Sequence, residues 1–340
     1  MEIDTNGGVA NGHQLPFEKP IARLQRQIAE LESSQADSGR DFAQEIRHLR
    51  TQHVALLRKT YKNLSAWETV QVSRHPARPL AGDYIERIVK NFVELHGDRR
   101  FADDKALRCG LGSIGPAGSE KIALIAQHKG RDTKEKIECN FGMCHPEGYR
   151  KALRVMKLAE KFSLPVVALI DTPGAYPGVD SEERGVAEAI AVNLREMSRL
   201  RTPIVCVVIG EGGSGGALGI GVGDRIAVLE FAYYSVISPE GCASILWRTG
   251  EKAPEAAESL KLTGKHLREL DIIDEIVPEP LGGAHRNPHE AAANLERFIL
   301  TMLRQLKRIP TDQLVKDRYE RWRRMGKVLH GQPSQPLASK

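Results

Sequence analysis

The chain has 340 residues, of which 41% are hydrophobic and 27% charged, a composition typical of a folded protein with a sizeable core. Its longest apolar runs, at 164–170 and 204–209, are far shorter than the roughly 20 residues that cross a bilayer. The N-terminus shows no secretory signal, and five cysteines, an odd number, do not suggest a disulfide framework. These features exclude a membrane-spanning protein and favour a cytoplasmic one.

The first part of the chain predicts helices. Residues 1–14 are expected to form a disordered tail. Within 15–62, apolar residues such as Ile21 and Leu24 recur at helical spacing on two segments that a polar stretch separates. This pattern predicts an α-hairpin arm, inside an N-terminal helical region over 15–104, whose apolar stripe packs on another subunit.

From residue 105 short apolar strands alternate with helices and Gly/Pro turns. Strands joined by helical crossovers imply right-handed connections and a sheet covered on its faces. Strands are expected at 121–127, 166–170, 204–210 and 225–231, and helices at 147–162, 182–200, 254–270 and 289–308. We assign 105–290 to the core, 291–330 to C-terminal basic helices and 331–340 to a flexible tail.

The formal net charge is +5, and one C-terminal segment accounts for it. Residues 304–327 hold nine Lys and Arg against three Asp and Glu. The simplest interpretation is a solvated basic helix, and the alternative is a docking face for a phosphate or an acidic partner. Nucleic-acid binding is only a secondary hypothesis, because the sequence has no zinc finger or RNP motif.

The glycine-rich segment 210–216, GEGGSGG, is the main chemical feature of the sequence. It matches the dinucleotide pattern GxGxxG, with Glu230 as the candidate ribose-binding acid. It also matches the nucleophile pattern GxSxG around Ser214, which needs an acid and a histidine such as His285 further along the chain. A Walker phosphate loop is excluded, because no Lys-Ser or Lys-Thr follows the glycines.

A third interpretation of these glycines depends only on the backbone. Glycines leave peptide N–H groups open to a substrate, and the first N–H groups of the following helix have no internal partner. Such donors suit an oxyanion hole, where each is worth roughly 3–4 kcal/mol of transition-state stabilisation. A tight turn that serves only helix packing is the structural alternative.

The sequence raises one metal hypothesis, at Cys139, Cys144 and His145. No CxxC pair accompanies these residues, so no metal is predicted on this chain.

Several motifs, in their order and spacing, resemble one known family. DTPGAYPG at 171–178 is followed by EERG, REMSRL, GEGGSGGAL, SVISPEGCASILW and EPLGGAHR. This series resembles the alpha subunit of bacterial acetyl-CoA carboxylase carboxyltransferase. The resemblance covers nearly the whole chain and shows no departure between about 129 and 288.

The resemblance implies an α/β fold of the crotonase type, a spiral of repeated ββα units preceded by the helical arm and followed by C-terminal helices. It implies transfer of a carboxyl group from carboxybiotin, carried on a separate biotin carboxyl carrier protein, to acetyl-CoA. The product is malonyl-CoA, for fatty acid biosynthesis. The implied partners are a beta subunit in an α2β2 assembly, which would carry the zinc, and a biotin carboxylase.

The resemblance also assigns roles within the glycine turn. The amides of Gly215 and Gly216 would form the oxyanion hole for the biotin ureido oxygen, and Gly212 and Gly213 would shape the approach to it. Replacing Gly216 with Val is therefore expected to abolish transfer while leaving the fold intact.

Further site candidates lie outside this turn. Tyr176, Pro177 and Gly178 follow the preceding strand and are expected to line the same site. Lys129 and Arg131 are candidates for binding anionic groups of the substrates, with a solvated loop as the alternative.

Two other classes of function stay open. One is another crotonase-fold acyl-CoA enzyme, such as a hydratase or decarboxylase, which would work without biotin. The other is a scaffold or regulatory subunit that uses the arm and the basic helix.

Overall fold

The computed structural model describes residues 13–38 and 40–326. The tails expected at 1–14 and 331–340 therefore lie almost entirely outside the described residues. Among the described residues, none of the helices has both the length and the apolar character that a membrane crossing requires.

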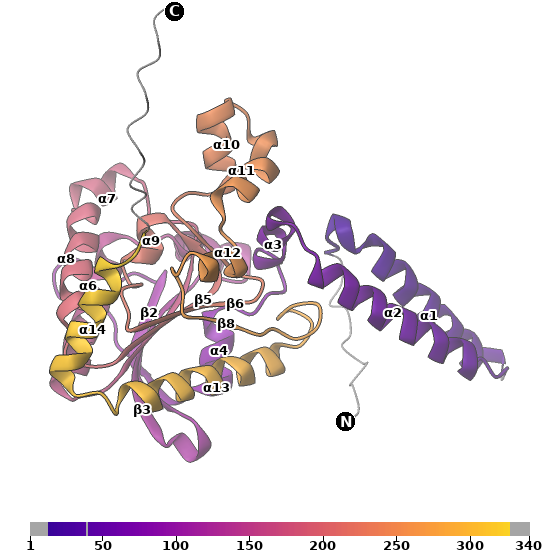
Figure 1. Cartoon of the computed structure of the whole chain (residues 1–340), viewed down its shortest axis with the longest axis horizontal. Helices are drawn as coiled ribbons and strands as arrows, with labels where there is room; N and C mark the ends of the chain where they lie inside the picture. Colours follow the sequence, from indigo (N-terminus) through magenta and orange to yellow (C-terminus); the bar gives the residue numbers. More distant parts are fainter. Residues whose placement is uncertain (1–12, 39, 327–340) are drawn as a thin grey trace, which may run out of the picture.

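An eight-stranded sheet forms the centre of the molecule, in the order β1-β2-β3-β4-β5-β6-β8, with β7 paired to β5 (Figure 1). The first three strands pair antiparallel and the remaining pairs are parallel. The strands are β1 Lys90–Glu94, β2 Leu107–Ile114, β3 Glu120–Gln127, β4 Val166–Thr172, β5 Ile204–Gly213, β6 Arg225–Leu229, β7 Tyr233–Ser235 and β8 Glu275–Val277. The parallel strands confirm the predicted α/β class.

The strands β4 and β5 form the middle of the core, and every residue of both is buried. Their apolar runs are continuous rather than alternating, as expected for strands covered on both faces. The helix α6 (Pro146–Lys161) packs on α8 (Val186–Arg199) and contacts β2 and β3. The helix α13 (Pro288–Leu306) packs on α4 (Ala81–Ile88) and contacts β5 and β8. The two loops that form the candidate site follow the carboxyl ends of β4 and β5.

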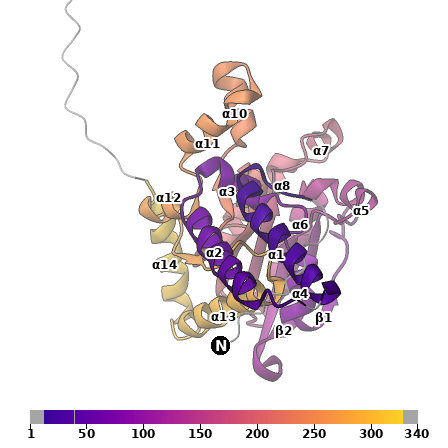
Figure 2. The same ribbon diagram turned by 90° about the vertical axis from the view of Figure 1, so that its right-hand side faces the viewer.

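The predicted hairpin arm is present. Its helices α1 (Lys19–Ser38) and α2 (Ala43–Lys62) pack on each other and project away from the body (Figures 1 and 2). At its base, the Tyr61 hydroxyl donates to Glu18 Oε1 at 2.8 Å, and the Arg286 guanidinium pairs with the same carboxylate at 2.6 Å. The arm is therefore fixed at one end, and packing of its length on another subunit stays a prediction.

The remaining helices are short and surround the sheet or project from it. They are α3 Ala66–Ser73, α5 Thr133–Glu138, α7 Val179–Glu183, α9 Ser214–Leu218, α10 Pro239–Trp247, α11 Ala253–Leu260, α12 Gly264–Glu269 and α14 Thr311–Arg323. The helices α10 and α11 stand out from the body (Figure 1). The end of α10 exposes Ile245, Leu246 and Trp247 at 72%, 63% and 43% of their surfaces.

Three expected helices differ in the structure. The stretch 63–104, read from the sequence as helical, contains the strand β1. The helix expected at 182–200 is divided into α7 and α8, because Gly185 takes a left-handed backbone with φ of 78°. The helix expected at 254–270 is divided into α11 and α12 after Lys261, which also has a positive φ.

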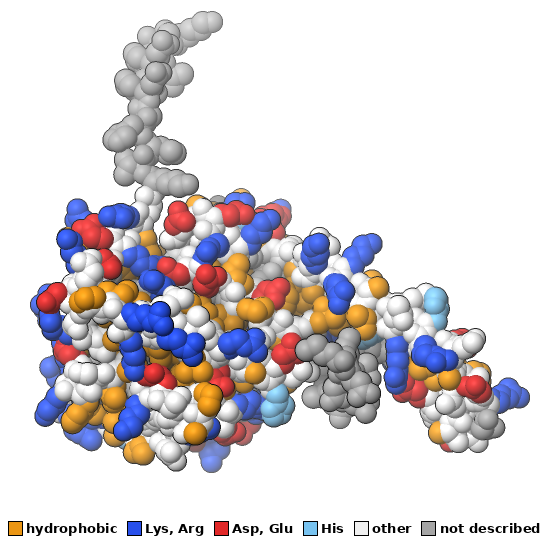
Figure 3. All heavy atoms as spheres, turned by 60° about the horizontal axis from the view of Figure 1, so that its bottom comes forward, with side chains coloured by type: hydrophobic (Ala, Val, Ile, Leu, Met, Phe, Trp, Pro, Cys, Tyr) orange, Lys and Arg blue, Asp and Glu red, His pale blue; other side chains and the backbone are white. Residues whose placement is uncertain are grey.

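The C-terminal basic segment is only partly solvated. Arg318 of α14 is 1% exposed, and its guanidinium pairs with both oxygens of Asp224 at 2.8 Å. The same group donates to the carbonyls of Met197, Leu200 and Thr202. On the face that Figure 3 shows, Lys and Arg side chains alternate with acidic and hydrophobic ones. Part of the basic charge of this segment is therefore structural.

Candidate functional site

The glycine turn joins β5 directly to α9. Ser214, the first residue of α9, has a left-handed backbone with φ of 55° and is exposed. Gly215 is half-buried and Gly216 is buried. The chain thus turns sharply from the fully buried strand into the short helix, and the start of α9 lies at the surface.

Most of the glycines in this turn are required by close backbone packing. A Cβ added at Gly213 would lie 2.2 Å from the carbonyl oxygen of Pro173, and one at Gly216 would lie 2.3 Å from the carbonyl carbon of Gly174. A Cβ at Gly212 would lie 2.8 Å from the ring of Tyr234. The turn after β5 and the loop after β4 therefore lie backbone against backbone.

Gly215 is different from its neighbours. A Cβ added there would meet only the Ile190 Cδ1 atom, at 3.9 Å. Among the hydrogen bonds of the described chain, neither Gly215 nor Gly216 uses its amide N–H as a donor. A pair of unused N–H groups at the half-buried start of a helix can receive a negatively charged oxygen.

This geometry corrects one expectation from the sequence. A valine at Gly216 would not leave the fold intact, because its side chain would displace the backbone of Gly174 and Ala175. Position 215 is the one where a side chain can be added without such a clash.

A buried ion cluster lies beneath the turn. Glu211, in β5 next to the glycines, accepts from the Arg74 Nε at 2.6 Å and the Tyr233 hydroxyl at 2.7 Å, and it contacts the Lys129 ammonium. Burial alone would raise the pKa of Glu211, but Lys129 and Arg74 outweigh that effect and lower it to about 2. The Glu211 carboxylate is therefore charged at neutral pH.

The same cluster ties β5 to β4. Asp171 accepts a hydrogen bond from the Glu211 amide at 2.9 Å and pairs with the Lys129 ammonium at 2.7 Å. Burial would lower the pKa of Lys129, but Asp171 and Glu211 raise it above its usual value. Lys129 is thus a charged link between two strand ends.

The two basic candidates both have carboxylate partners. The Lys129 side chain is 16% exposed and is bound within the cluster, while Arg131, 53% exposed, pairs with Asp83. Their contact with substrate anions stays a prediction.

The loop after β4 brings the other candidates beside the turn. Tyr176 and Gly178 are half-buried and Pro177 is exposed. The Tyr176 ring packs on the ring of His145, with centroids 4.3 Å apart, and its amide donates to the Cys144 carbonyl at 3.0 Å. Together with the close contacts at Gly213 and Gly216, these contacts join the loop after β4 and the glycine turn after β5 into one surface.

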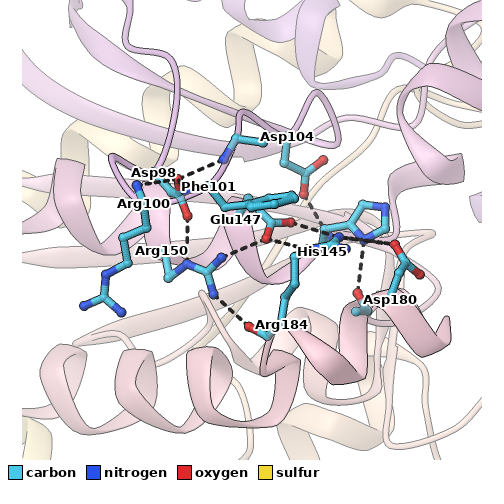
Figure 4. Close-up of polar contacts among 11 residues, drawn as sticks. Asp98, Arg100, Phe101, Asp104, His145, Glu147, Arg150, Asp180 and Arg184 are labelled. Atoms are coloured by element: carbon cyan, nitrogen blue, oxygen red, sulfur yellow. Dashed lines mark hydrogen bonds and ion pairs between the residues drawn. The ribbon is translucent and has the colours of Figure 1, made fainter.

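His145, on which the Tyr176 ring packs, belongs to a polar cluster (Figure 4). His145 Nδ1 lies 3.0 Å from the Ser181 hydroxyl and 3.3 Å from the Arg184 guanidinium. The guanidinium groups of Arg150 and Arg184 meet at the buried carboxylate of Glu147, at 2.8 and 2.9 Å. His145 Nδ1 also lies 3.9 Å from the Asp180 carboxylate, and Cys144 is buried with its thiol donating to the Ala106 carbonyl.

The two alternative motifs at the glycine turn, the nucleophile pattern around Ser214 and the dinucleotide pattern with Glu230, lack the partner residues that they need. His285 stacks on His75, with ring centroids 4.0 Å apart, and makes no contact with Ser214. Glu230 accepts a hydrogen bond from the Glu279 amide at 3.0 Å, so its carboxylate already has a structural partner. A hydrolase triad at Ser214 therefore does not form among these residues.

Sequence reasoning missed three residues of this site. Arg74 lies after α3, far from the glycine turn in sequence, and Tyr233 begins β7. Gln127, at the end of β3, is fully buried and hydrogen-bonds to both Asp171 and Gly216. The sequence does offer one signal for Gln127, because it is a polar residue at the end of an apolar strand.

Comparisons with known proteins agree with the resemblance. The family model "Acetyl co-enzyme A carboxylase carboxyltransferase-like" matches residues 14–326. The chain is 51% identical over 318 residues to the acetyl-coenzyme A carboxylase carboxyl transferase subunit alpha of Rhodopirellula baltica, covering 94% of this chain and 98% of that protein. It is 54% identical over 320 residues to the subunit of the same name from Methylococcus capsulatus, with the same coverage.

A solved structure confirms the fold. The geranyl-CoA carboxylase beta subunit of P. aeruginosa aligns with a TM-score of 0.52 at 18% identity, over 73% of this chain and 46% of that one. The crotonase-type carboxyltransferase fold predicted from the sequence is therefore confirmed.

Proposed function

Since this chain belongs to the acetyl-CoA carboxylase carboxyltransferase alpha family, we propose that it forms the carboxybiotin half of a carboxyltransferase site. The reaction moves the carboxyl group of carboxybiotin to acetyl-CoA and gives malonyl-CoA for fatty acid biosynthesis. The observation that supports this half-site is the open edge at Gly215, beside two amide N–H groups that have no partner among the described residues.

The chemistry needs what this edge offers. When the carboxyl group leaves, negative charge develops on the ureido oxygen of biotin, and the amides of Gly215 and Gly216 would donate to it. Preorganised backbone donors of this kind are typically worth about 3–4 kcal/mol each in the transition state. In this proposal Gly212 and Gly213 shape the approach, and Tyr176, Pro177 and Gly178 line the adjoining surface.

The acetyl-CoA half of the site would lie on a beta subunit, in an α2β2 assembly. The apolar end of α10 supports a protein partner, because Ile245 and Leu246 are both more than 60% exposed on a helix that projects from the body. Exposed apolar clusters of this kind mark interaction surfaces. We further propose that the beta subunit carries the zinc, that biotin arrives on a carrier protein loaded by a biotin carboxylase, and that the assembly is cytoplasmic.

Reconstitution tests the proposal. The chain mixed with its beta subunit, carboxybiotin on the carrier protein and acetyl-CoA is expected to form malonyl-CoA, measured by chromatography. The chain alone, or the mixture without carboxybiotin, is expected to form almost none. Full turnover by the isolated chain would contradict the shared site, and turnover of an acyl-CoA without biotin would favour the hydratase or decarboxylase alternative.

A further inference from the structure

Gln127 connects the ends of β3 and β4 to the glycine turn through its side-chain amide. The residue ends β3 and is 0% exposed. Its Oε1 accepts from the Asp171 amide at 3.1 Å, and its Nε2 donates to the carbonyl oxygen of Gly216 at 2.9 Å. A neutral amide can make both bonds at once because it has a donor and an acceptor.

The bond to Gly216 matters because α9 has only five residues. The carbonyls of Ala217 and Leu218 accept from the amides of Ile220 and Gly221, so these carbonyls have partners along the chain. The Gly215 carbonyl accepts from the Gly219 amide at 2.9 Å, and the Gly216 carbonyl accepts from Gln127 and, at 3.3 Å, from the Tyr149 hydroxyl. The Gly216 N–H lies in the same peptide plane as the Gly215 carbonyl and points away from it, and the bond from Gln127 holds the next peptide, which joins Gly216 to Ala217.

We propose that Gln127 is a positioning residue for carboxyl transfer, which anchors the peptide between Gly216 and Ala217 and thereby keeps the preceding amides of Gly215 and Gly216 facing the biotin oxygen. The inference rests on the proposed function of those amides. Gln127 does not touch the substrate, since its side chain is enclosed between β4 and α9. Its effect is on kcat, through the orientation of the donors.

The isosteric variant Gln127→Glu separates this role from simple packing. An ionised carboxylate can accept from the Asp171 amide but cannot donate to the Gly216 carbonyl, whereas a protonated one can do both. Burial raises the pKa of such a carboxyl, so the protonated form is accessible at mildly acidic pH. The variant is therefore expected to recover activity as pH falls.

Two titratable side chains beside Gln127, Cys144 and Tyr149, do not titrate in this range. Burial raises the pKa of the Cys144 thiol and of the Tyr149 hydroxyl well above their usual values. The Asp171 carboxylate is paired with Lys129. A pH-dependent ratio between variant and parent would thus report the new carboxyl.

The experiment uses the reconstituted assembly with carboxybiotin and acetyl-CoA. At pH 8.5 we expect kcat of Gln127→Glu to be at least about tenfold below the parent, with KM for acetyl-CoA unchanged, and the deficit to shrink several-fold at pH 6.5. Asn193→Asp is the matched control, because Asn193 is also a fully buried amide that donates to two carbonyls, those of Tyr149 and Gly219. It is expected to lower the melting temperature but to keep most of kcat.

Three results would overturn the inference: parental kcat in Gln127→Glu at pH 8.5, a deficit that does not change with pH, or the same pH-dependent loss in Asn193→Asp. Gly215→Ala, measured in parallel, separates the role of Gln127 from the proposed half-site on which that role rests. Loss of activity in Gly215→Ala with none in Gln127→Glu would reject the role of Gln127 alone. Full activity in both variants would reject the proposed half-site as well.

Discussion

The Lys129 ammonium lies 2.7 Å from Oδ1 of Asp171 and also contacts the Glu211 carboxylate, so one cation joins the ends of two neighbouring strands. Arg74 binds the other oxygen of Glu211. Two cations therefore face two buried carboxylates next to the glycine turn, and Arg74 also pairs with the partly exposed carboxylate of Glu240 at 2.5 Å.

Removing the Lys129 charge is expected to make the stability of the protein pH-dependent. Lys129→Met leaves buried carboxylates with one cation, which typically costs about 3–5 kcal/mol. Lys129 is the largest of the effects that lower the pKa of Glu211, and burial, which raises that pKa, remains in the variant, so we expect the pKa of Glu211 to rise above its ordinary value of 4.5. A group whose folded pKa is raised stabilises at low pH and loses that contribution as pH increases, so the melting temperature should fall from pH 5 to pH 8 more steeply than in the parent.

The double variant Lys129→Met with Asp171→Asn is the control for charge. It leaves one cation, Arg74, beside one buried carboxylate, Glu211, and is expected to recover most of the lost stability at pH 8. An unstable double variant would contradict the charge-balance explanation. Activity that stays lost in a stable double variant would assign Lys129 to substrate contact.

The buried guanidinium of Arg318 is expected to be essential for attachment of α14. Arg318→Met leaves Asp224 buried without its partner, at a cost of about 3–5 kcal/mol in the free energy of unfolding. Lysine should not substitute, because it lacks the planar fork that spans both carboxylate oxygens. Urea unfolding measures the effect, and Lys316→Met, on the exposed side of α14, should change stability by less than about 0.5 kcal/mol. Equal effects in both variants would contradict this account.

The stacked histidines at the base of the arm predict acid sensitivity. Burial lowers the pKa of His285 from 6.5 to about 2, with His75 and Arg286 nearby adding to the effect. Because the unfolded chain takes up the proton near pH 6.5 and the folded chain does not, stability falls as pH drops below about 6.5, by at most ~1.4 kcal/mol per pH unit for this group.

Replacing this imidazole with a ring that does not titrate tests the prediction. His285 Nδ1 is buried without a hydrogen-bond partner in the part of the chain that the structure describes, so His285→Phe removes no bond at that atom. We expect the variant to melt higher than the parent at pH 5.5 and close to it at pH 8. The same acid dependence in both proteins would remove His285 as the cause.

The apolar end of α10 is expected to bind the beta subunit. Leu246→Asp alters a side chain that is 63% exposed, so the isolated chain should keep its melting temperature. Association with the beta subunit should weaken by roughly thirtyfold or more, as at an interface hot spot, and calorimetry measures it. Phe162→Asp, at a 59% exposed phenylalanine next to the end of α6, is the matched control and should bind normally. Equal affinity in both variants would place the interface elsewhere.

The parts of the fold that followed from sequence are those with strong local patterns. The continuous apolar runs of β4 and β5 and the helical spacing of the arm depend on neighbours along the chain. The strand β2 was missed because Gly110 and Gly112 interrupt its apolar pattern. Both glycines are needed for packing against residues 89–93, where a Cβ would lie within 2.4 and 2.5 Å of other atoms.

Only the part of the site that lies on one continuous segment could be predicted from the sequence. The glycine turn stood out as a motif, but Arg74 and Tyr233 reach Glu211 through the tertiary fold, and no spacing rule connects them. The same is true of Arg318, whose partner Asp224 is far away in sequence. The sequence alone shows these charged residues, but it does not show which of them form ion pairs in the folded protein.

Gly215 offers the most direct test of the half-site. An added methyl group has room beside Ile190, and alanine is the better helix former by up to about 1 kcal/mol, so Gly215→Ala should melt at or above the parental temperature. Gly216→Ala, in contrast, should melt lower because its methyl group meets the backbone of Gly174.

The decisive measurement is kcat for malonyl-CoA formation by the reconstituted assembly containing Gly215→Ala or Gly215→Val. Side chains at this position cover the amide edge, and loss of one oxyanion donor typically costs about a hundredfold or more in rate. We expect a loss of at least about tenfold with alanine and a larger one with valine, in folded and assembled protein. Parental kcat in a correctly assembled Gly215→Val enzyme would contradict it.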